Sequence, residues 1–179
     1  MAQTTFQGPV RSLGGIYQQG PATVVEITSS TALTPVAHAG RIISVGGSLA
    51  AAVTLTLPSI NVSANSVTSG PGQDPNTANN EGVTYTIWVP TTISTSSLKI
   101  GTDGTDKFVG SVISVDTDSS GAVVGFTAGS SNDFINLNGT TTGGVAGTWI
   151  QIVAVAANKY MVTGVVLGSG SVATPFADA

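Results

Sequence analysis

Two short acidic segments hold the residues of this chain that are best suited to bind a metal ion. Asp103 and Asp106 lie in Asp-Gly-Thr-Asp, and Asp116 and Asp118 flank a single threonine. Calcium requires several carboxylate and carbonyl oxygens that converge on one ion. Neither segment has the spacing or the closing glutamate of an EF-hand loop, and turns also favour aspartate and glycine. The sequence favours turns at both places and leaves a weak calcium site open as the alternative.

The only histidine, His38, is the candidate for acid–base chemistry. A nucleophilic triad needs a base, an orienting acid and a nucleophile in contact, and the chain has no Gly-x-Ser-x-Gly elbow. Cysteine is absent, which excludes thiolate nucleophiles and thiolate metal sites. We therefore interpret His38 as a loop or interface residue and expect no enzyme activity, no metal ion and no cofactor.

Trp88 and Trp149 are the aromatic residues that could form a platform for a sugar ring. Both lie in strand-like runs among apolar residues, Thr-Ile-Trp-Val and Thr-Trp-Ile-Gln-Ile. Large aromatic side chains in such runs are typical of a core or a subunit interface. The core or an interface is therefore the favoured interpretation for both.

The composition limits the classes of partner. Only 8% of the 179 residues are charged, and the net charge is −4, whereas about a quarter of an average domain is charged. Five basic residues cannot form the patch that binds nucleic acid. No apolar stretch reaches the ~18 residues of a membrane helix, and the start of the chain lacks the regions of a signal peptide. We expect a protein made in the cytoplasm, without nucleic-acid or membrane partners.

The elements that must position these residues are strands. Residues that favour strands recur in short runs separated by Gly, Asn, Asp and Ser, and strong helix formers are scarce. Many short strands without intervening helices indicate an antiparallel β-sandwich or barrel, jelly-roll-like. The expected strands are 23–28, 41–45, 53–57, 83–89, 98–100, 108–116, 122–127, 134–137, 148–156 and 159–167.

Three glycine or asparagine positions predict local geometry. Residues 118–121 form a hairpin turn, with Gly121 at the position that needs a positive φ. Ala157-Asn158 joins the last two strands as a tight antiparallel hairpin. Gly110, inside a strand-like run, is interpreted as a β-bulge.

Two segments lack the short apolar runs that predict strands in the rest of the chain. Residues 1–20 form an N-terminal arm with several Gly-Pro and Gly-Gly pairs, and residues 21–179 form a single all-β domain. The second segment, residues 61–82, is rich in Ser, Asn, Gly and Pro, and a loop of that length is commonly functional or disordered. The arm cannot bury its larger side chains alone, so we expect it to contact a partner through Phe6, Pro9, Val10, Arg11, Leu13, Ile16 and Tyr17.

Three segments of the sequence carry motifs of a known family. Residues 5–15, Thr-Phe-Gln-Gly-Pro-Val-Arg-Ser-Leu-Gly-Gly, resemble the arms that begin many structural proteins of tailed phages, in particular marine and cyanobacterial ones. Residues 41–58, from Arg-Ile-Ile-Ser-Val to Val-Thr-Leu-Thr-Leu-Pro, are similar to a segment of capsid decoration and head-fibre proteins. Gly143-Gly-x-x-Gly-Thr-Trp-Ile150 with Asn-Lys-Tyr at 158–160 also resembles them, and only the long segment 61–82 departs.

The resemblance implies a capsid decoration, or cement, protein on the outer surface of a virion. Such a protein bridges subunits of the major capsid protein, usually as a homotrimer, and the resemblance implies no catalytic residues. The arm residues named above would then contact the capsid. The alternative is a head-fibre or tail-fibre module that binds a host-surface glycan through the loop at 61–82 or through Trp88.

Overall fold

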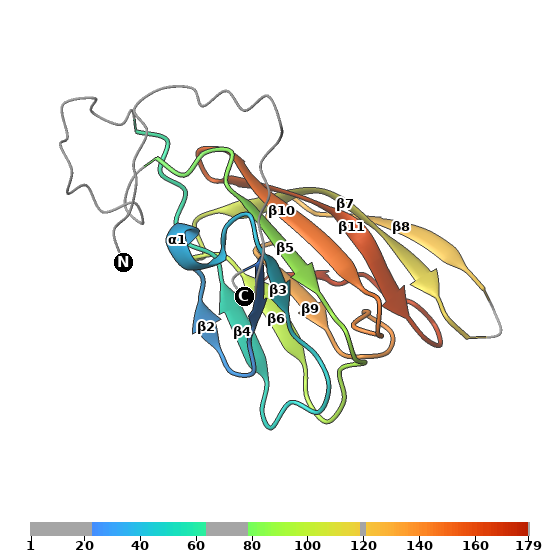
Figure 1. Cartoon of the computed structure of the whole chain (residues 1–179). Coiled ribbons are helices and arrows are strands. Elements are labelled where there is room, and N and C mark those ends of the chain that lie inside the picture. Colours follow the sequence, from blue (N-terminus) through green and yellow to red (C-terminus); the bar gives the residue numbers. More distant parts are fainter. Residues whose placement is uncertain (1–22, 64–78, 119–120, 179) are drawn as a thin grey trace, which may run out of the picture.

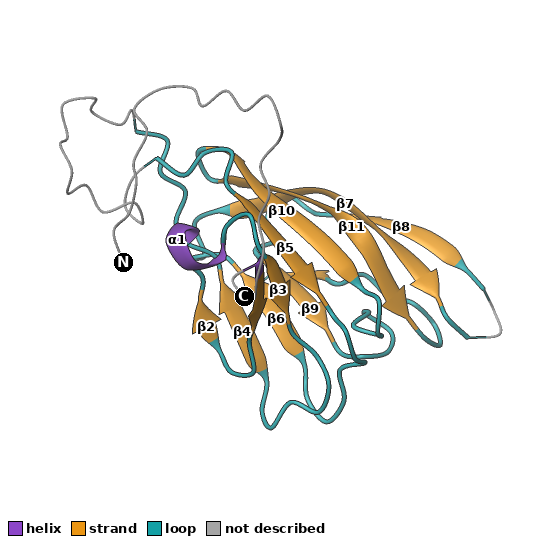
Figure 2. Ribbon diagram, viewed as in Figure 1, coloured by secondary structure: helices purple, strands orange, loops and turns teal. Residues whose placement is uncertain are grey.

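The chain folds into two β-sheets that pack face to face. The computed structural model describes residues 23–63, 79–118 and 121–178. One sheet has seven strands in the order β1-β3-β5-β10-β11-β7-β8, and the other has five in the order β12-β9-β6-β4-β2. Figure 2 shows these strands and one short helix, α1 (Pro35–His38). The all-β sandwich is confirmed; each sheet of the described chain keeps two open edges, so neither closes into a barrel.

The ten strands expected from the sequence are all present, with ends that differ by at most two residues. The seven-stranded sheet contains β1 (Val24–Glu26), β3 (Ile42–Ser44), β5 (Thr84–Trp88), β7 (Lys107–Asp116), β8 (Val123–Thr127), β10 (Trp149–Ala156) and β11 (Lys159–Gly168). The five-stranded sheet contains β2 (Thr31–Ala32), β4 (Val53–Thr56), β6 (Leu98–Gly101), β9 (Phe134–Leu137) and β12 (Phe176–Ala177). The two unexpected strands, β2 and β12, are too short to show a periodic pattern.

The directions of the strands differ from the antiparallel arrangement that we expected. The pairs β1–β3, β3–β5, β2–β4, β4–β6 and β7–β11 are parallel, and the other five are antiparallel. The first six strands alternate between the two sheets. A chain that runs up one sheet and down the other returns to the first sheet in its original direction, so neighbours there are parallel. The sheets are thus mixed, unlike those of an antiparallel jelly roll.

Both predicted hairpins are present, but the predicted bulge is not. Strands β10 and β11 are antiparallel across Ala157-Asn158, where Asn158 has a φ of 59°. Strands β7 and β8 are also antiparallel, and Gly121 has a positive φ of 59°. Gly110 pairs in regular register with Val162. It has a φ of 105°, and a Cβ there would lie 2.4 Å from the carbonyl oxygen of Val162, so the close approach of two backbones requires this glycine.

The core lies between the sheets and is made by alternate residues of the strands. Most of its members are aliphatic, and its largest side chains are Tyr85, Phe108 and Tyr160. The Tyr160 hydroxyl donates a hydrogen bond of 2.5 Å to the carbonyl oxygen of Pro58. Burial raises the pKa of Tyr160, so the hydroxyl stays protonated and remains a donor.

The two sheets differ in size, and the larger one extends beyond the smaller. In Figure 1, β7 and β8 lie far to the right of β2 and β4. Strand β8 is exposed along most of its length, and Val123 and Val124 are both solvent-accessible although they point to opposite faces of the sheet. Residues 23–63, 79–118 and 121–178 therefore leave this end of the large sheet uncovered on both sides.

Gly110→Ala should lower the free energy of unfolding by at least about 2 kcal/mol, because an L side chain is strained at this φ and its Cβ meets a backbone oxygen. Gly125→Ala on the adjacent strand β8 is the matched control. A Cβ at Gly125 meets no atom within 4 Å, so this change should cost less than about 0.5 kcal/mol. Urea unfolding measures the free energy of unfolding of both variants, and an equal loss in the two would refute the role assigned to Gly110.

Candidate functional site

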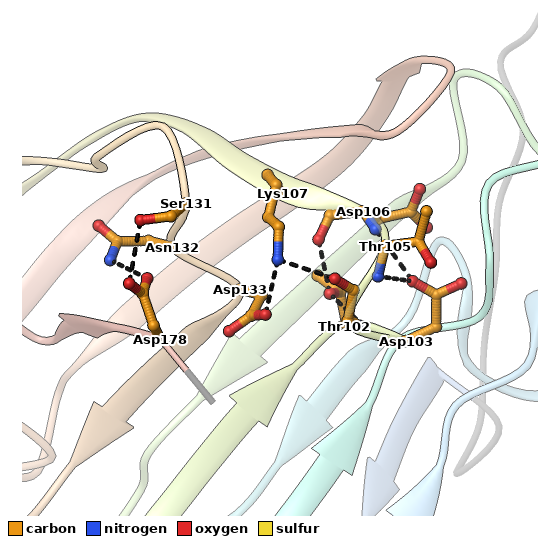
Figure 3. Close-up of polar contacts among 10 residues, drawn as sticks. Thr102, Asp103, Thr105, Asp106, Lys107, Ser131, Asn132, Asp133 and Asp178 are labelled. Carbon is orange, nitrogen blue, oxygen red and sulfur yellow. Dashed lines mark hydrogen bonds and ion pairs between the residues drawn. The ribbon is translucent and has the colours of Figure 1, made fainter.

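Asp103 organises the turn between β6 and β7 (Figure 3). Its Oδ1 accepts hydrogen bonds from the backbone N–H groups of Thr105 at 2.9 Å and of Asp106 at 3.0 Å. Its Oδ2 accepts a bond of 2.6 Å from the Ser59 hydroxyl, which comes from the segment after β4. Both carboxylate oxygens thus accept hydrogen bonds from other groups of the protein, as the interpretation as a turn predicts.

Asp106 and Lys107 link further segments at the end of the sandwich where Asp103 lies. The Asp106 side chain is buried, and its Oδ2 accepts a bond of 2.9 Å from the backbone N–H of Ile60. Lys107 Nζ lies 2.7 Å from Asp133 Oδ2 and donates to the Gly104 carbonyl oxygen at 2.7 Å. Segments from both sheets are therefore linked at this end.

The second acidic segment also makes the contacts of a turn. Asp116 Oδ1 accepts a bond of 3.0 Å from the backbone N–H of Asp118, and Asp118 Oδ2 accepts one of 2.7 Å from Gly170. Within residues 23–63, 79–118 and 121–178, no group of three or more His, Cys, Asp or Glu side chains is placed to hold a metal ion. The four aspartates of the two acidic segments thus accept hydrogen bonds from loop groups.

The two neighbouring carboxyl groups titrate in opposite directions. Burial disfavours the charged form of Asp103, but hydrogen bonds from Ser59, Asp106 and Thr105 outweigh burial and lower its pKa. Burial raises the pKa of Asp106, and the negative charge of Asp103 adds to this effect, although the N–H of Ile60 opposes it. Folding therefore favours the ionised form of Asp103 and the protonated form of Asp106.

His38 is the last residue of α1 and is largely buried. Its Nδ1 accepts a hydrogen bond of 2.9 Å from the backbone N–H of Thr34, the residue that caps the helix. The Thr34 hydroxyl accepts a bond from the N–H of Ala37 at the same helix start. The geometry gives His38 a local role in closing this single helical turn.

Trp88 and Trp149 lie side by side on the solvent-facing side of the seven-stranded sheet. They are directly paired between β5 and β10 and are 40% and 38% exposed. The interpretation as core residues is therefore wrong, and the role in an interface stays a prediction. The sequence did indicate that both indoles face solvent. Trp88 shares its strand face with the polar residues Thr84 and Thr86, and Trp149 shares its face with Gln151.

The tryptophans belong to a continuous row across the sheet. Trp149 pairs with Val165 of β11, and Val165 pairs with Ile113 of β7. Val165 and Ile113 are exposed, as are other apolar residues of the same side. We call this surface the outer face; its large apolar members are Val24, Ile42, Trp88, Ile113, Val123, Trp149, Met161 and Val165.

The outer face carries no charge in its interior. All charged residues of the seven strands stand at strand ends, namely Glu26, Lys107, Asp116 and Lys159. Between the apolar rows runs a polar row in which Thr86, Gln151 and Thr163 are paired across three strands. An uncharged apolar centre with charges at its edge is the usual anatomy of a protein interface.

A shallow groove of about 300 Å³ lies at one side of the outer face. It is lined by Ile42, Thr86, Trp88 and Trp149. Two indole rings with one hydroxyl could hold the apolar face of a small ring while bonding one polar group. The groove is the described feature that best fits the glycan alternative.

The seven residues expected to contact a capsid, from Phe6 to Tyr17, lie outside the described residues, and so does most of the loop at 61–82. The two ends of that loop are described and are joined by Asn80. Its Oδ1 accepts a bond of 2.8 Å from the N–H of Asn61, and its Nδ2 donates to the carbonyl oxygen of Ser59 at 2.9 Å. The loop thus leaves the sandwich and re-enters it at nearly the same point.

Comparisons with known proteins identify no relative. No protein-family model matches the chain, and neither a curated protein nor a solved structure is detectably similar to it. Among the described residues, no helix has the length and apolar character needed to cross a membrane.

Asp103→Asn and Asp106→Asn should change the pH dependence of stability with opposite signs. At pH values above the ordinary pKa of aspartate, ionised Asp103 stabilises the fold, and this stabilisation is lost as the pH falls. Asp103→Asn should therefore lower the free energy of unfolding more at pH 7 than at about pH 3. The raised pKa of Asp106 means that its ionisation weakens the fold as the pH rises. Asp106→Asn should therefore be more favourable, relative to the unchanged chain, at pH 7 than at about pH 3.

Urea unfolding of both variants and of the unchanged chain at the two pH values measures these differences. Each variant serves as the control for the other, because both remove one carboxylate from the same turn. If the two differences have the same sign, the assignment of opposite roles is wrong.

Proposed function

We propose that this chain is a structural protein that decorates the outer surface of a phage capsid. It binds the major capsid protein, acts as a homotrimer and has no catalytic role. The observation that carries the proposal is the outer face of the seven-stranded sheet. Monomeric proteins rarely expose a broad apolar surface, and such surfaces commonly mark contacts with other proteins. The location on a capsid rests on the resemblance of residues 5–15, 41–58, 143–150 and 158–160 to phage structural proteins.

In this proposal the chain stabilises the capsid by burying surface and not by catalysing a reaction. Apolar area removed from water contributes about 25 cal/mol per Å², less the cost of ordering the segments that bind. The N-terminal residues Phe6, Pro9, Val10, Arg11, Leu13, Ile16 and Tyr17 supply the contact with the capsid. Because a shell carries many copies, a modest contribution from each copy is multiplied over the particle.

A second candidate function is the binding of a host-surface glycan by a head-fibre or tail-fibre module. The groove between Trp88 and Trp149 favours it, because exposed paired indoles are suited to stack on a sugar ring. The groove is shallow and lies at the side of a much larger apolar surface. The decoration role uses the whole surface, so it remains the first proposal.

Capsids that lack the protein should gain regular density at local three-fold positions when the purified chain is added. Cryo-electron microscopy of the mixed particles measures this directly. Deletion of residues 1–20 should abolish the added density, because the deletion removes the seven contact residues. Retained binding by the shortened chain would refute the role of the arm, and an unchanged shell with the full chain would refute the decoration proposal.

A glycan-array measurement with the full chain tests the second candidate. Binding of a defined glycan that is lost in Trp88→Ala, and kept in Val36→Ala away from the groove, would favour the fibre module. A loss of at least about tenfold is expected for removal of one stacking indole. Absence of binding to all glycans would remove this candidate.

A further inference from the structure

We infer that the outer face of the seven-stranded sheet is the surface through which copies of this chain bind one another. The occupant is thus another copy of the same chain, and in the homotrimer the outer faces of all three copies turn inward and are buried against one another. The inference assigns the copy-to-copy contact of the proposed homotrimer and rests on the proposed function in that respect. The arm at residues 1–20 keeps its separate role toward the capsid.

The first argument is the distribution of charge. The chain carries a net charge of −4, so two copies repel one another over most orientations. The interior of the outer face has no charged side chain, and the charged residues of its strands are confined to strand ends. An approach through this face brings two acidic molecules together without placing like charges opposite one another.

The second argument is that the face is complementary to itself. Its apolar row of Trp88, Trp149 and Val165 runs beside the polar row of Thr86, Gln151 and Thr163. Hydroxyl and amide side chains both donate and accept hydrogen bonds. A polar row of this kind can pair with an identical row, whereas a row of carboxylates or ammonium groups could not. Apolar rows pack on apolar rows without any requirement for a different partner.

The third argument is the area available. Strands lie about 4.8 Å apart and rise about 3.3 Å per residue, so seven strands span about 29 Å. The strands contain three to ten residues, and their average of about six residues corresponds to a length of about 20 Å. The sheet therefore offers roughly 600 Å² per copy, compared with about 800 Å² per partner in a stable protein interface. The face is large enough to hold an assembly together.

The chain provides its own probe for this contact. It contains two tryptophans, Trp88 and Trp149, and both are on the outer face. Association through the face should shield both indoles from water. Their emission should therefore shift to the red, and quenching by acrylamide should increase, when the assembled protein is diluted until it dissociates.

The test combines sedimentation velocity and light scattering of the full chain between about 1 and 100 μM. At high concentration the mass should be three times that of the 17.7 kDa chain, and dissociation at low concentration should be accompanied by the change in fluorescence. Val165→Glu places a charge in the centre of the face and should raise the dissociation constant at least about tenfold. Val62→Glu is the matched control, because Val62 lies away from the sheet and is 42% exposed, against 38% for Val165.

Both glutamate variants should keep the circular dichroism spectrum and melting temperature of the unchanged chain, because both sites are exposed. Ile113→Lys, at a site that is 50% exposed on the neighbouring strand, is the second variant on the face and should act like Val165→Glu if the latter fails to fold. A chain that stays monomeric at all concentrations would overturn the inference. So would association that neither face variant weakens.

Other occupants give different results. If removal of residues 1–20 from a monomeric chain shifts the emission to the red, the chain's own N-terminal segment covers the face and the inference is wrong. Monomers that decorate capsids would overturn the inference and the homotrimer, and would leave the decoration of the capsid standing. Assemblies that dissociate on Val165→Glu but never bind a capsid would support the inference and refute the proposed function.

Discussion

The two sheets share one core because the chain crosses from one sheet to the other after most strands. Strands β1 to β6 alternate between the sheets, so residues close in sequence stand on opposite sides of the same apolar layer. Each crossing makes the next strand in a given sheet parallel to its neighbour, as in β1–β3–β5 and β2–β4–β6. The mixed direction of the sheets and the burial of their inward faces both follow from this path.

The crossing path also explains where the polar residues lie. Connections between sheets meet at the ends of the sandwich, where backbone groups leave the ladders and need other partners. Carboxylates and amides supply those partners: Asp103 and Asp106 hold the segment after β4 to the β6–β7 turn, and Asn80 closes the long loop. Most of the described aspartates thus hold loops, and the interior of the outer face is left uncharged, whereas Lys99 is exposed on β6 of the smaller sheet.

The unequal number of strands leaves one end of the large sheet open. Five strands face seven, so the described chain leaves the β7–β8 end uncovered, in addition to the outward side that each sheet of a two-layer sandwich has. On the outward side of the large sheet, rows of indole and aliphatic side chains alternate with rows of threonine and glutamine. A surface that is both apolar and free of charge in its centre suits contact with protein, and this property connects the architecture with the proposed role in a virion.

Local structure could be read from the amino-acid sequence alone. Alternation of apolar and polar residues located ten strands within two residues, and Ala157-Asn158 and Gly121 marked two hairpins, because side-chain period and turn geometry act over a few residues. The sequence could not determine which strands pair, since pairing joins segments as distant as β7 and β11. The same limit explains why the sequence left both the core and an interface open for Trp88 and Trp149. Local pattern defines the two sides of a strand, and only the packing of one sheet on another decides which side is buried.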